Sequence, residues 1–250
     1  MAAAGTDERG SVTTSAQGRR PGRIARTVSV VGEVLITLGL VLALFVVYSL
    51  WWTNVVADRH AQAAGDKVRK EWAQAQAGSG KGAVPRGLDT KDGIGFLHVP
   101  AMGHGYEVLV KKGTSTKVLN EGVAGYYTEP TPAAMPWDST GNFTVAAHRD
   151  GHGAKFHKID KIHVGDPVVF ESKDTWYVYK VYKVLDQTSK YDVAVTDQVP
   201  KQSGKTRPGR YITLTTCTPV YTSLYRYVVW GQLVRTQKVD AQRTPPPELR

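Results

Sequence analysis

Only one cysteine, Cys217, occurs among the 250 residues. A single thiol excludes an internal disulfide framework, so the fold must be stable through its hydrophobic core alone. A lone cysteine is by default a small buried hydrophobic residue. An exposed thiol in an oxidising compartment is open to oxidation unless it has a task, however, and the surroundings of Cys217 favour a functional thiol.

The chain also lacks a clustered basic stripe, although its formal net charge is +10. Several arginines precede an apolar segment, and the other basic residues are spread along the rest of the chain. Proteins that bind nucleic acids usually concentrate Lys and Arg on one face. We therefore expect no nucleic-acid partner and attribute the charge to solubility near an anionic envelope.

Formal charges are absent from residues 34–52, which are dominated by Leu, Val, Ile, Ala and Phe. At about 1.5 Å per residue, a helix of this length spans roughly 29 Å, close to the thickness of a bilayer core. Basic residues precede the segment and aromatic residues end it: Arg19, Arg20, Arg23 and Arg26, then Tyr48, Trp51 and Trp52. The positive-inside rule places the N-terminus in the cytoplasm.

We therefore predict a single-pass protein of the cell membrane, with a disordered cytoplasmic tail over 1–27 and an uncleaved signal-anchor over 28–53. The alternative is a cleaved signal peptide, whose apolar region is usually about 7–15 residues long. The longer segment here ends in two tryptophans, which favours the anchor. Residues 54–92 are then predicted to form an extracellular stalk and a flexible, glycine-containing linker.

After residue 92, short runs of β-forming residues alternate with turns, which indicates an all-β barrel or sandwich over residues 93–239. The runs cover 94–100, 107–110, 142–148, 167–171, 176–184, 210–217 and 225–234. Single helical turns are predicted over 115–121 and 155–162, and a disordered, proline-containing tail over 240–250.

Three side chains that support nucleophilic catalysis stand at or near the ends of these predicted strands. Cys217 ends a threonine-rich run just before a Thr-Pro pair, where proline stops strand pairing. Arg226 stands near the start of the next strand, and His148 ends an apolar strand. Neighbouring strand ends would place a thiol beside a permanent cation, and His148 stands where a barrel rim presents functional side chains. The other six histidines are interpreted as solvated or structural.

Such a pair would be only weakly activated by default. With ordinary pKa values of about 8.5 for Cys and 6.5 for His, about one per cent of the pairs are thiolate and imidazolium near neutral pH. The enzyme would be slow unless Arg226 or the surrounding fold raised that fraction.

Two other motif fragments do not fit the chemistry that they suggest. His148 and the histidine four positions later have the spacing of a zinc protease, but Arg149 replaces the general-base Glu and Gly151 disfavours the required helix. Residues 204–206 match the end of a P-loop, whose first glycine would fall at Val199. We therefore expect no metal and no cofactor.

The segment 213–217 (TLTTC), with Arg226 downstream and His148 upstream within 147–150 (AHRD), resembles the motifs of the sortases. These are the membrane-anchored cysteine transpeptidases of Gram-positive bacteria. The resemblance covers residues 93–236 and implies an eight-stranded β-barrel with short helices. It also implies cleavage of a C-terminal sorting signal, Leu-Ala-x-Thr-Gly or Leu-Pro-x-Thr-Gly, between Thr and Gly.

The resemblance assigns a role to each site residue. Cys217 would be the nucleophile that forms a thioacyl intermediate, and His148 the general acid for the leaving amine. Arg226 would stabilise the oxyanion or hold the substrate threonine. Thr215 and Thr216 would line the substrate and oxyanion region. The implied partners are secreted proteins with a sorting signal and an amine of a lipid II-type peptidoglycan precursor.

The segment 119–126 ends in Gly125-Tyr126, where other sortases often carry Gly-His. This pair is similar to class E, the housekeeping sortases of high-GC actinobacteria, which prefer Ala over Pro in the sorting signal. Tyr126 would then contact the substrate. It is equally consistent with barrel packing, and the neighbouring Tyr127 leaves the register open. No N-terminal lid motif is seen, which favours wall anchoring over pilus polymerisation.

Two alternatives lie outside this interpretation. A membrane-tethered β-barrel that only binds wall or protein partners would not need the Cys-His-Arg set. An L,D-transpeptidase also pairs Cys with His and Arg, but its Ser-His-Gly-Cys arrangement is absent, because Thr215 and Thr216 precede the cysteine.

Overall fold

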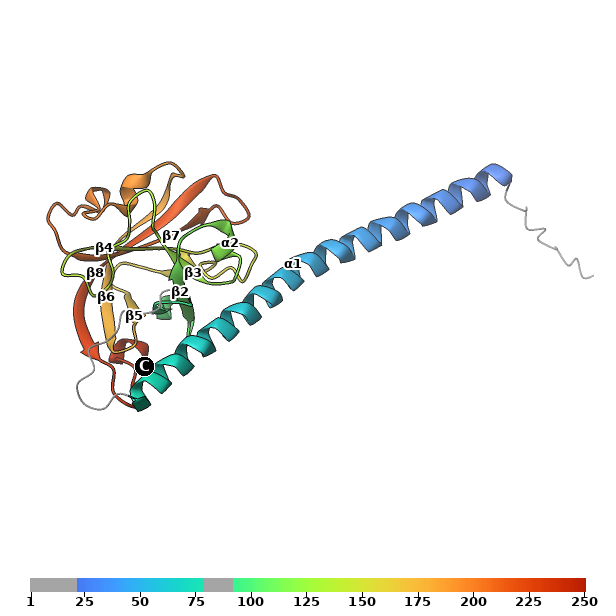
Figure 1. Ribbon diagram of the computed structural model, residues 1–250. Helices are drawn as coiled ribbons and strands as arrows, with labels where there is room; N and C mark the ends of the chain where they lie inside the picture. The colour runs from blue at the N-terminus through green and yellow to red at the C-terminus, as the bar shows by residue number, and fades with distance from the viewer. Residues whose placement is uncertain (1–21, 79–91) are drawn as a thin grey trace, which may run out of the picture. The chain divides into compact units, whose positions relative to one another are not determined.

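The computed structural model describes residues 22–78 and 92–250 (Figure 1). The chain divides into two compact units, Met1–Tyr48 and Ser49–Arg250. Helix α1 (Arg23–Gly78) contributes residues to both units, so its two halves are considered separately. Two segments lie outside the described residues. They are residues 1–21 of the predicted cytoplasmic tail and residues 79–91, which contain most of the predicted flexible linker.

The first half of α1 is apolar on all sides. Leu35, Phe45 and Val47 each expose more than half of their surface. Among the described residues, this is one helix long and apolar enough to cross a membrane, with a mean hydropathy of 2.7. A helix that is hydrophobic all round is stable when it is buried in protein or lipid. The finding is consistent with a membrane anchor at the predicted position.

The second unit contains a closed eight-stranded barrel with the strand order β1-β2-β3-β4-β7-β8-β6-β5, which confirms the predicted fold. The strands are β1 (Gly95–His98), β2 (Glu107–Lys112), β3 (Ala124–Tyr126), β4 (Gly141–Ala146), β5 (Pro167–Glu171), β6 (Thr175–Ser189), β7 (Arg210–Thr218) and β8 (Tyr225–Lys238). The seven predicted runs correspond to seven of these strands. The remaining strand, β3, has only three residues and is too short for a recognisable pattern.

Short helices lie in the connections: η1 (Pro100–Met102), α2 (Thr116–Leu119), η2 (Ile159–Lys161), η3 (Val193–Thr196), η4 (Lys201–Ser203) and η5 (Pro247–Leu249). Two of them, α2 and η2, fall within the predicted helical turns. The η3 segment packs on the barrel through Val195, which clusters with Val228 and Trp230 of β8. The Trp230 indole donates a hydrogen bond to the Val195 carbonyl at 3.1 Å, which fixes this segment over the strand.

Most neighbouring strands are antiparallel, but β2 and β3 run parallel, and so do β4 and β7, in which Ala146 lies opposite Thr215. Strands β4 and β7 therefore end at the same rim of the barrel. The chain segments that carry His148 and Cys217 leave the sheet side by side at that rim. This pairing is the element of the fold that positions the site.

The second half of α1 packs against the barrel. Val68 and Trp72 join a buried cluster with Phe96, Leu109 and Val123, and the rings of Trp72 and Phe96 meet edge-on at 5.6 Å. The segment predicted as a polar stalk therefore has an apolar face that is covered by β1 and β2. We call residues 54–78 the stalk below.

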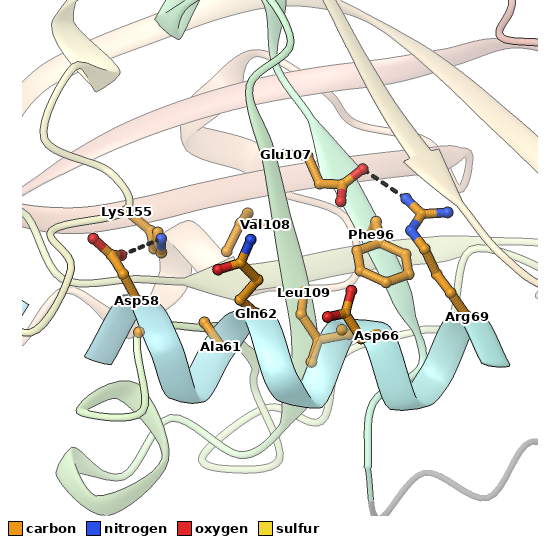
Figure 2. A pocket seen from close by; sticks show the side chains of 12 residues that line it. Asp58, Ala61, Gln62, Asp66, Arg69, Phe96, Glu107, Val108, Leu109 and Lys155 are labelled. Atoms are coloured by element: carbon orange, nitrogen blue, oxygen red, sulfur yellow. Dashed lines mark hydrogen bonds and ion pairs between the residues drawn. The ribbon is translucent and has the colours of Figure 1, made fainter. Parts of the chain in front are cut away.

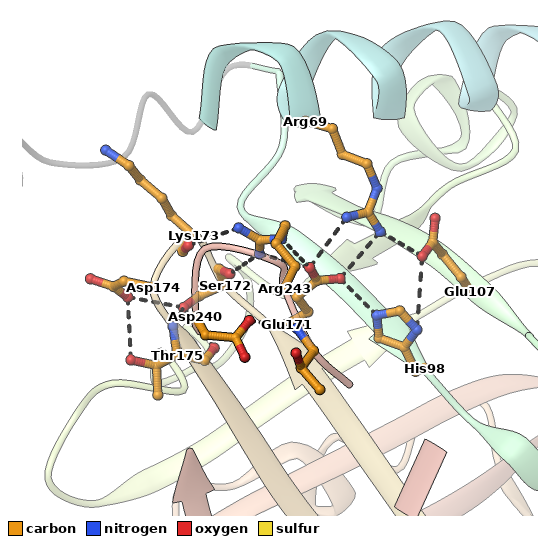
Figure 3. A network of polar contacts seen from close by, with 11 residues as sticks. Arg69, His98, Glu107, Glu171, Ser172, Lys173, Asp174, Thr175, Asp240 and Arg243 are labelled. Atoms are coloured by element: carbon orange, nitrogen blue, oxygen red, sulfur yellow. Dashed lines mark hydrogen bonds and ion pairs between the residues drawn. The ribbon is translucent and has the colours of Figure 1, made fainter. Parts of the chain in front are cut away.

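A buried ionic network ties the stalk to the barrel and to the C-terminal tail (Figure 3). Glu171 is only 1% exposed and accepts hydrogen bonds from Arg69, Arg243 and His98. Arg69 also pairs with Glu107 at 2.6 Å. The side chains of His98, Glu107 and Glu171 approach one another closely enough to hold a metal ion, but both carboxylates are already paired with Arg69.

The prediction that residues 240–250 are disordered is wrong, because this segment is folded against the barrel. Arg243 reaches Glu171, donates to the carbonyls of Ser172 and Lys173, and stacks on Trp72 at 4.5 Å. Glu248 pairs with Arg235 of β8. Composition alone indicated disorder, whereas these long-range ion pairs supply the order.

Glu171→Gln is expected to lower the free energy of unfolding and to make it less dependent on pH in the acid range. Burial alone would raise the pKa of Glu171, but the His98 hydrogen bond and the two arginines outweigh it and lower the pKa from 4.5 to about 2. The ionised form therefore stabilises the fold above about pH 4.5, and this contribution is lost as the pH falls towards 2. Breaking a buried ion pair from one side typically costs about 3–5 kcal/mol.

Urea unfolding of the detergent-solubilised chain across this pH window measures the effect. The wild type should lose free energy of unfolding on acidification, and the variant should start lower and lose less. The same pH dependence in both proteins would show that Glu171 is not the titrating group.

Candidate active site

The side chains that converge at the rim lie on the outer face of the barrel. Phe143 and Val145 of β4, with Ile212 and Leu214 of β7, point into the buried core. Successive side chains of a strand point to opposite faces. The alternate residues Thr213, Thr215 and Cys217 of β7 therefore face outwards.

Cys217 of β7 is directly opposite Arg226 of β8 in the antiparallel register. Opposite residues of paired strands project their side chains on the same face, so the thiol and the guanidinium are neighbours. The thiol is half-buried, and no disulfide involves it. One terminal nitrogen of Arg226 donates to the carbonyls of Ser223 and Tyr225 at 3.3 and 3.0 Å, which holds the side chain at the mouth of the site.

His148 is held at the same rim by contacts between β4 and β7. The Ala147 N–H donates to the Thr215 carbonyl at 3.3 Å, and the Thr216 hydroxyl donates to the Ala147 carbonyl at 2.7 Å. These bonds extend the parallel pairing by one residue beyond β4. His148 consequently leaves the sheet beside Cys217, and both line one cavity of about 420 Å³ together with Arg226.

Asn120 fixes the orientation of the His148 ring. Its Oδ1 lies 2.8 Å from Nε2 of His148. An amide oxygen only accepts hydrogen bonds, so this nitrogen carries a proton and Nδ1 is the nitrogen left for chemistry. Sequence reasoning did not single out Asn120, because an isolated asparagine far from the histidine in the chain carries no local signal.

The electrostatic surroundings disfavour the charged form of His148. Burial lowers the pKa of His148, the neighbouring His152 lowers it further, and Asp150 opposes both. The rings of His148 and His152 are 5.6 Å apart. Asp150 also accepts a hydrogen bond from the Tyr221 N–H at 2.6 Å, so the histidine loop is connected to the β7–β8 loop.

The threonines predicted to contact the substrate also line the cavity. Thr215 and Thr216 are almost fully buried beneath it. The phenol oxygen of Tyr127 lies 2.9 Å from Oγ1 of Thr215. Burial raises the pKa of Tyr127, against the opposing influence of Thr215 and Arg226, so the phenol remains a hydrogen-bond donor.

Tyr126 lies on the other side of β3. It is 6% exposed and belongs to the barrel core, and it is not among the residues that line this cavity. The two adjacent tyrosines point to opposite faces because of the two-residue period of a strand. The cavity therefore contains Cys217, His148, Arg226 and both threonines, with Tyr127 in the place that the sequence had suggested for Tyr126.

This arrangement is suited to acyl transfer. A thiol can attack a carbonyl carbon, an imidazole can transfer a proton to or from the amine, and a guanidinium can stabilise the oxyanion. The cavity also has apolar walls that include Leu119, Val193 and Val195, as a peptide side chain would require.

Comparison with known proteins supports the same interpretation. The Sortase domain family model matches residues 97–234. The chain is 65% identical over 248 residues to Sortase SrtE2 of Streptomyces coelicolor, and the match covers 98% of each chain. The crystal structure of Sortase E1 from Streptomyces coelicolor with tripeptide in the active site is 44% identical, with a TM-score of 0.59, over 63% of this chain and 96% of that chain.

The structure of sortase E from Streptomyces avermitilis is similar as well, with 37% identity and a TM-score of 0.56 over 63% of this chain and 97% of that chain. The family match, the identity and the fold all agree. The chain therefore belongs to the sortase family of transpeptidases, within class E.

Proposed function

We propose that this sortase cleaves a Leu-Ala-x-Thr-Gly or Leu-Pro-x-Thr-Gly sorting signal between Thr and Gly and joins the threonine to an amine of a peptidoglycan precursor. The observation that carries the proposal is the convergence of Cys217, His148 and Arg226 on one cavity with partly apolar walls. The tripeptide in the active site of the Streptomyces coelicolor Sortase E1 crystal supports a peptide substrate here.

The first half of the reaction forms a thioester. The Cys217 thiolate attacks the threonine carbonyl carbon, and the Arg226 guanidinium stabilises the negative oxygen of the tetrahedral intermediate. As the C–N bond breaks, the protonated His148 gives its Nδ1 proton to the leaving glycine amine. Asn120 keeps the opposite nitrogen engaged, so the ring presents Nδ1 throughout.

The second half reverses these roles. The acceptor amine attacks the thioester carbon, His148 takes the proton that the amine loses, and the Cys217 thiolate leaves. A peptide bond replaces the thioester, and the thiolate–imidazolium pair is restored. No oxidant or cofactor is needed, because the bonds broken and formed are all acyl bonds.

The apolar half of α1 supports a location at the cell membrane. Arginines precede the apolar segment and aromatic residues end it, which favours a cytoplasmic N-terminus and an extracellular barrel. This orientation would place the site where secreted proteins and lipid-linked wall precursors meet.

Cys217→Ala is expected to abolish both cleavage and transfer while the barrel remains folded. The thiol is half-buried at a strand end, so alanine removes the nucleophile at little cost in stability. Mass spectrometry of a sorting peptide incubated with a small amine measures the two products, and circular dichroism checks the fold. Residual hydrolysis by a folded variant would contradict the nucleophile assignment.

Tyr127→Phe is expected to change the preference between the Ala and Pro forms of the signal. The phenol faces the cavity, and an alanine offers a backbone N–H that a proline lacks. One or two such contacts are worth about 1–3 kcal/mol, or roughly 5- to 150-fold in the ratio of kcat/KM for the two peptides. Tyr126→Phe is the matched control from the core. A change in the ratio for Tyr126→Phe alone would return the role to Tyr126.

His152→Asn is expected to raise the pKa of His148 and move the acidic limb of the kcat/KM profile to higher pH. Loss of the neighbouring imidazole removes one of the influences that lower this pKa. The acidic limb reports the imidazole, since it normally titrates below a thiol. Asparagine tolerates the left-handed φ of 45° at this position.

The measurement compares the pH profiles of wild type, His152→Asn and His163→Asn. His163 is largely exposed and lies outside the cavity, so its replacement should leave the profile unchanged. An acidic limb that stays in place in His152→Asn would show that the two rings do not interact in solution.

A further inference from the structure

The stalk crosses the loop that follows His148. Asn54 accepts a hydrogen bond from the Gly153 N–H through Oδ1 at 2.9 Å, and Asp58 forms an ion pair with Lys155 at 2.7 Å. Figure 2 shows Asp58 on the helix with its carboxylate directed at the Lys155 ammonium. Two consecutive turns of the stalk therefore hold the same loop.

Two glycines allow the loops to approach the stalk closely. A Cβ added to Gly122 would lie 2.7 Å from the Ala57 carbonyl oxygen. A Cβ added to Gly153 would lie 2.9 Å from an Asp58 carboxylate oxygen and 3.4 Å from the α-carbon of Gly122. Both glycines also have positive φ angles, which other residues rarely adopt. The Gly122 loop thus meets the stalk backbone directly, and the Gly153 loop meets the Gly122 loop and the side chains of Asn54 and Asp58.

One of these loops holds the His148 ring and the other holds its backbone. Asn120, two residues before Gly122, is the hydrogen-bond partner of Nε2. On the other side, the Phe156 N–H donates to the His148 carbonyl at 2.9 Å, and Phe156 directly follows Lys155. A shift of the stalk would therefore be transmitted to both partners of the histidine.

The stalk is also fixed at its far end. Arg69 pairs with Glu171 and Glu107, and Trp72 is packed between Phe96 and Arg243. A helix that is held by a buried ion pair and an aromatic contact is a rigid support for the loops at its other end.

We propose that Asn54 and Asp58 of the stalk are positioning residues that set the His148 ring for proton transfer, so that the helix is part of the catalytic unit as well as a tether. The proposal rests on the general-acid role of His148 in the proposed function. The stalk residues do not line the cavity of Cys217 and act through the two loops.

The ion pair is tested by reversing it in the full-length protein in detergent micelles. Asp58→Lys and Lys155→Asp each place like charges together and should lower kcat for transpeptidation about 10- to 100-fold, as displacement of a catalytic group does. KM for the sorting peptide should stay near the wild-type value, because the stalk does not line the cavity of Cys217. The double variant restores opposite charges and should recover most of the lost kcat.

Asn54→Ala is an independent test that introduces no charge, and it remains usable if Asp58→Lys folds poorly. It should lower kcat and shift the acidic limb of the kcat/KM profile, which reports the His148 environment. Asp66→Lys is the matched control, since it makes the same charge change two turns further along the stalk. It should keep the wild-type kcat and pH profile.

The outcomes separate the two proposals. Wild-type kcat and pH profiles in folded Asn54→Ala and Asp58→Lys, with activity lost in His148→Ala, would overturn the positioning role alone. Wild-type activity in His148→Ala would overturn the function assigned to His148 and the positioning role with it. Recovery of kcat in the charge-reversed double variant supports the positioning role when the single variants lose kcat but unfold in urea like the wild type, because the swap would also reverse a mere loss of stability.

Discussion

The parallel pairing of β4 with β7 is the constraint on which the site depends. Parallel strands end at the same edge of a sheet, so the residues that follow β4 and the last residues of β7 emerge together. The hydrogen bonds between Ala147 and Thr215 and between Thr216 and Ala147 continue that alignment to His148. The antiparallel register of β7 with β8 then adds Arg226 opposite Cys217. His148 is thereby brought from a distant part of the sequence to the same cavity as Cys217 and Arg226.

The strands place the side chains of the candidate site, but the loops orient them. The His148 ring is held between Asn120 on one loop and His152 on its own loop, and its pKa is lowered by burial and by that second histidine. Burial and the second histidine therefore disfavour the imidazolium form, so proton transfer depends all the more on the placement of the ring by the loops. The contacts of the loops with the helix that leads from the apolar segment are consistent with that dependence.

Much of the fold was predictable because it is encoded locally. Seven of the eight strands have patterns of β-forming residues, and the predicted helical turns contain α2 and η2. The three-residue β3 and the ordered tail were not predicted, because the first is too short for a pattern and the second depends on Arg243 reaching the buried Glu171. The polar composition of the stalk likewise concealed the apolar face that Val68 and Trp72 present to the barrel.

The sequence by itself identified the family, because Cys217, His148 and Arg226 stand in short motifs at recognisable strand ends, and it identified class E from the pair Gly125-Tyr126. Which of two adjacent tyrosines faces the cavity was decided only by the tertiary structure. A shift of one residue in a strand reverses the face of every side chain, and only the pairing of β3 with its neighbours fixes that choice. Asn120 and the stalk were likewise beyond local reasoning, since their partners in space are far away in sequence.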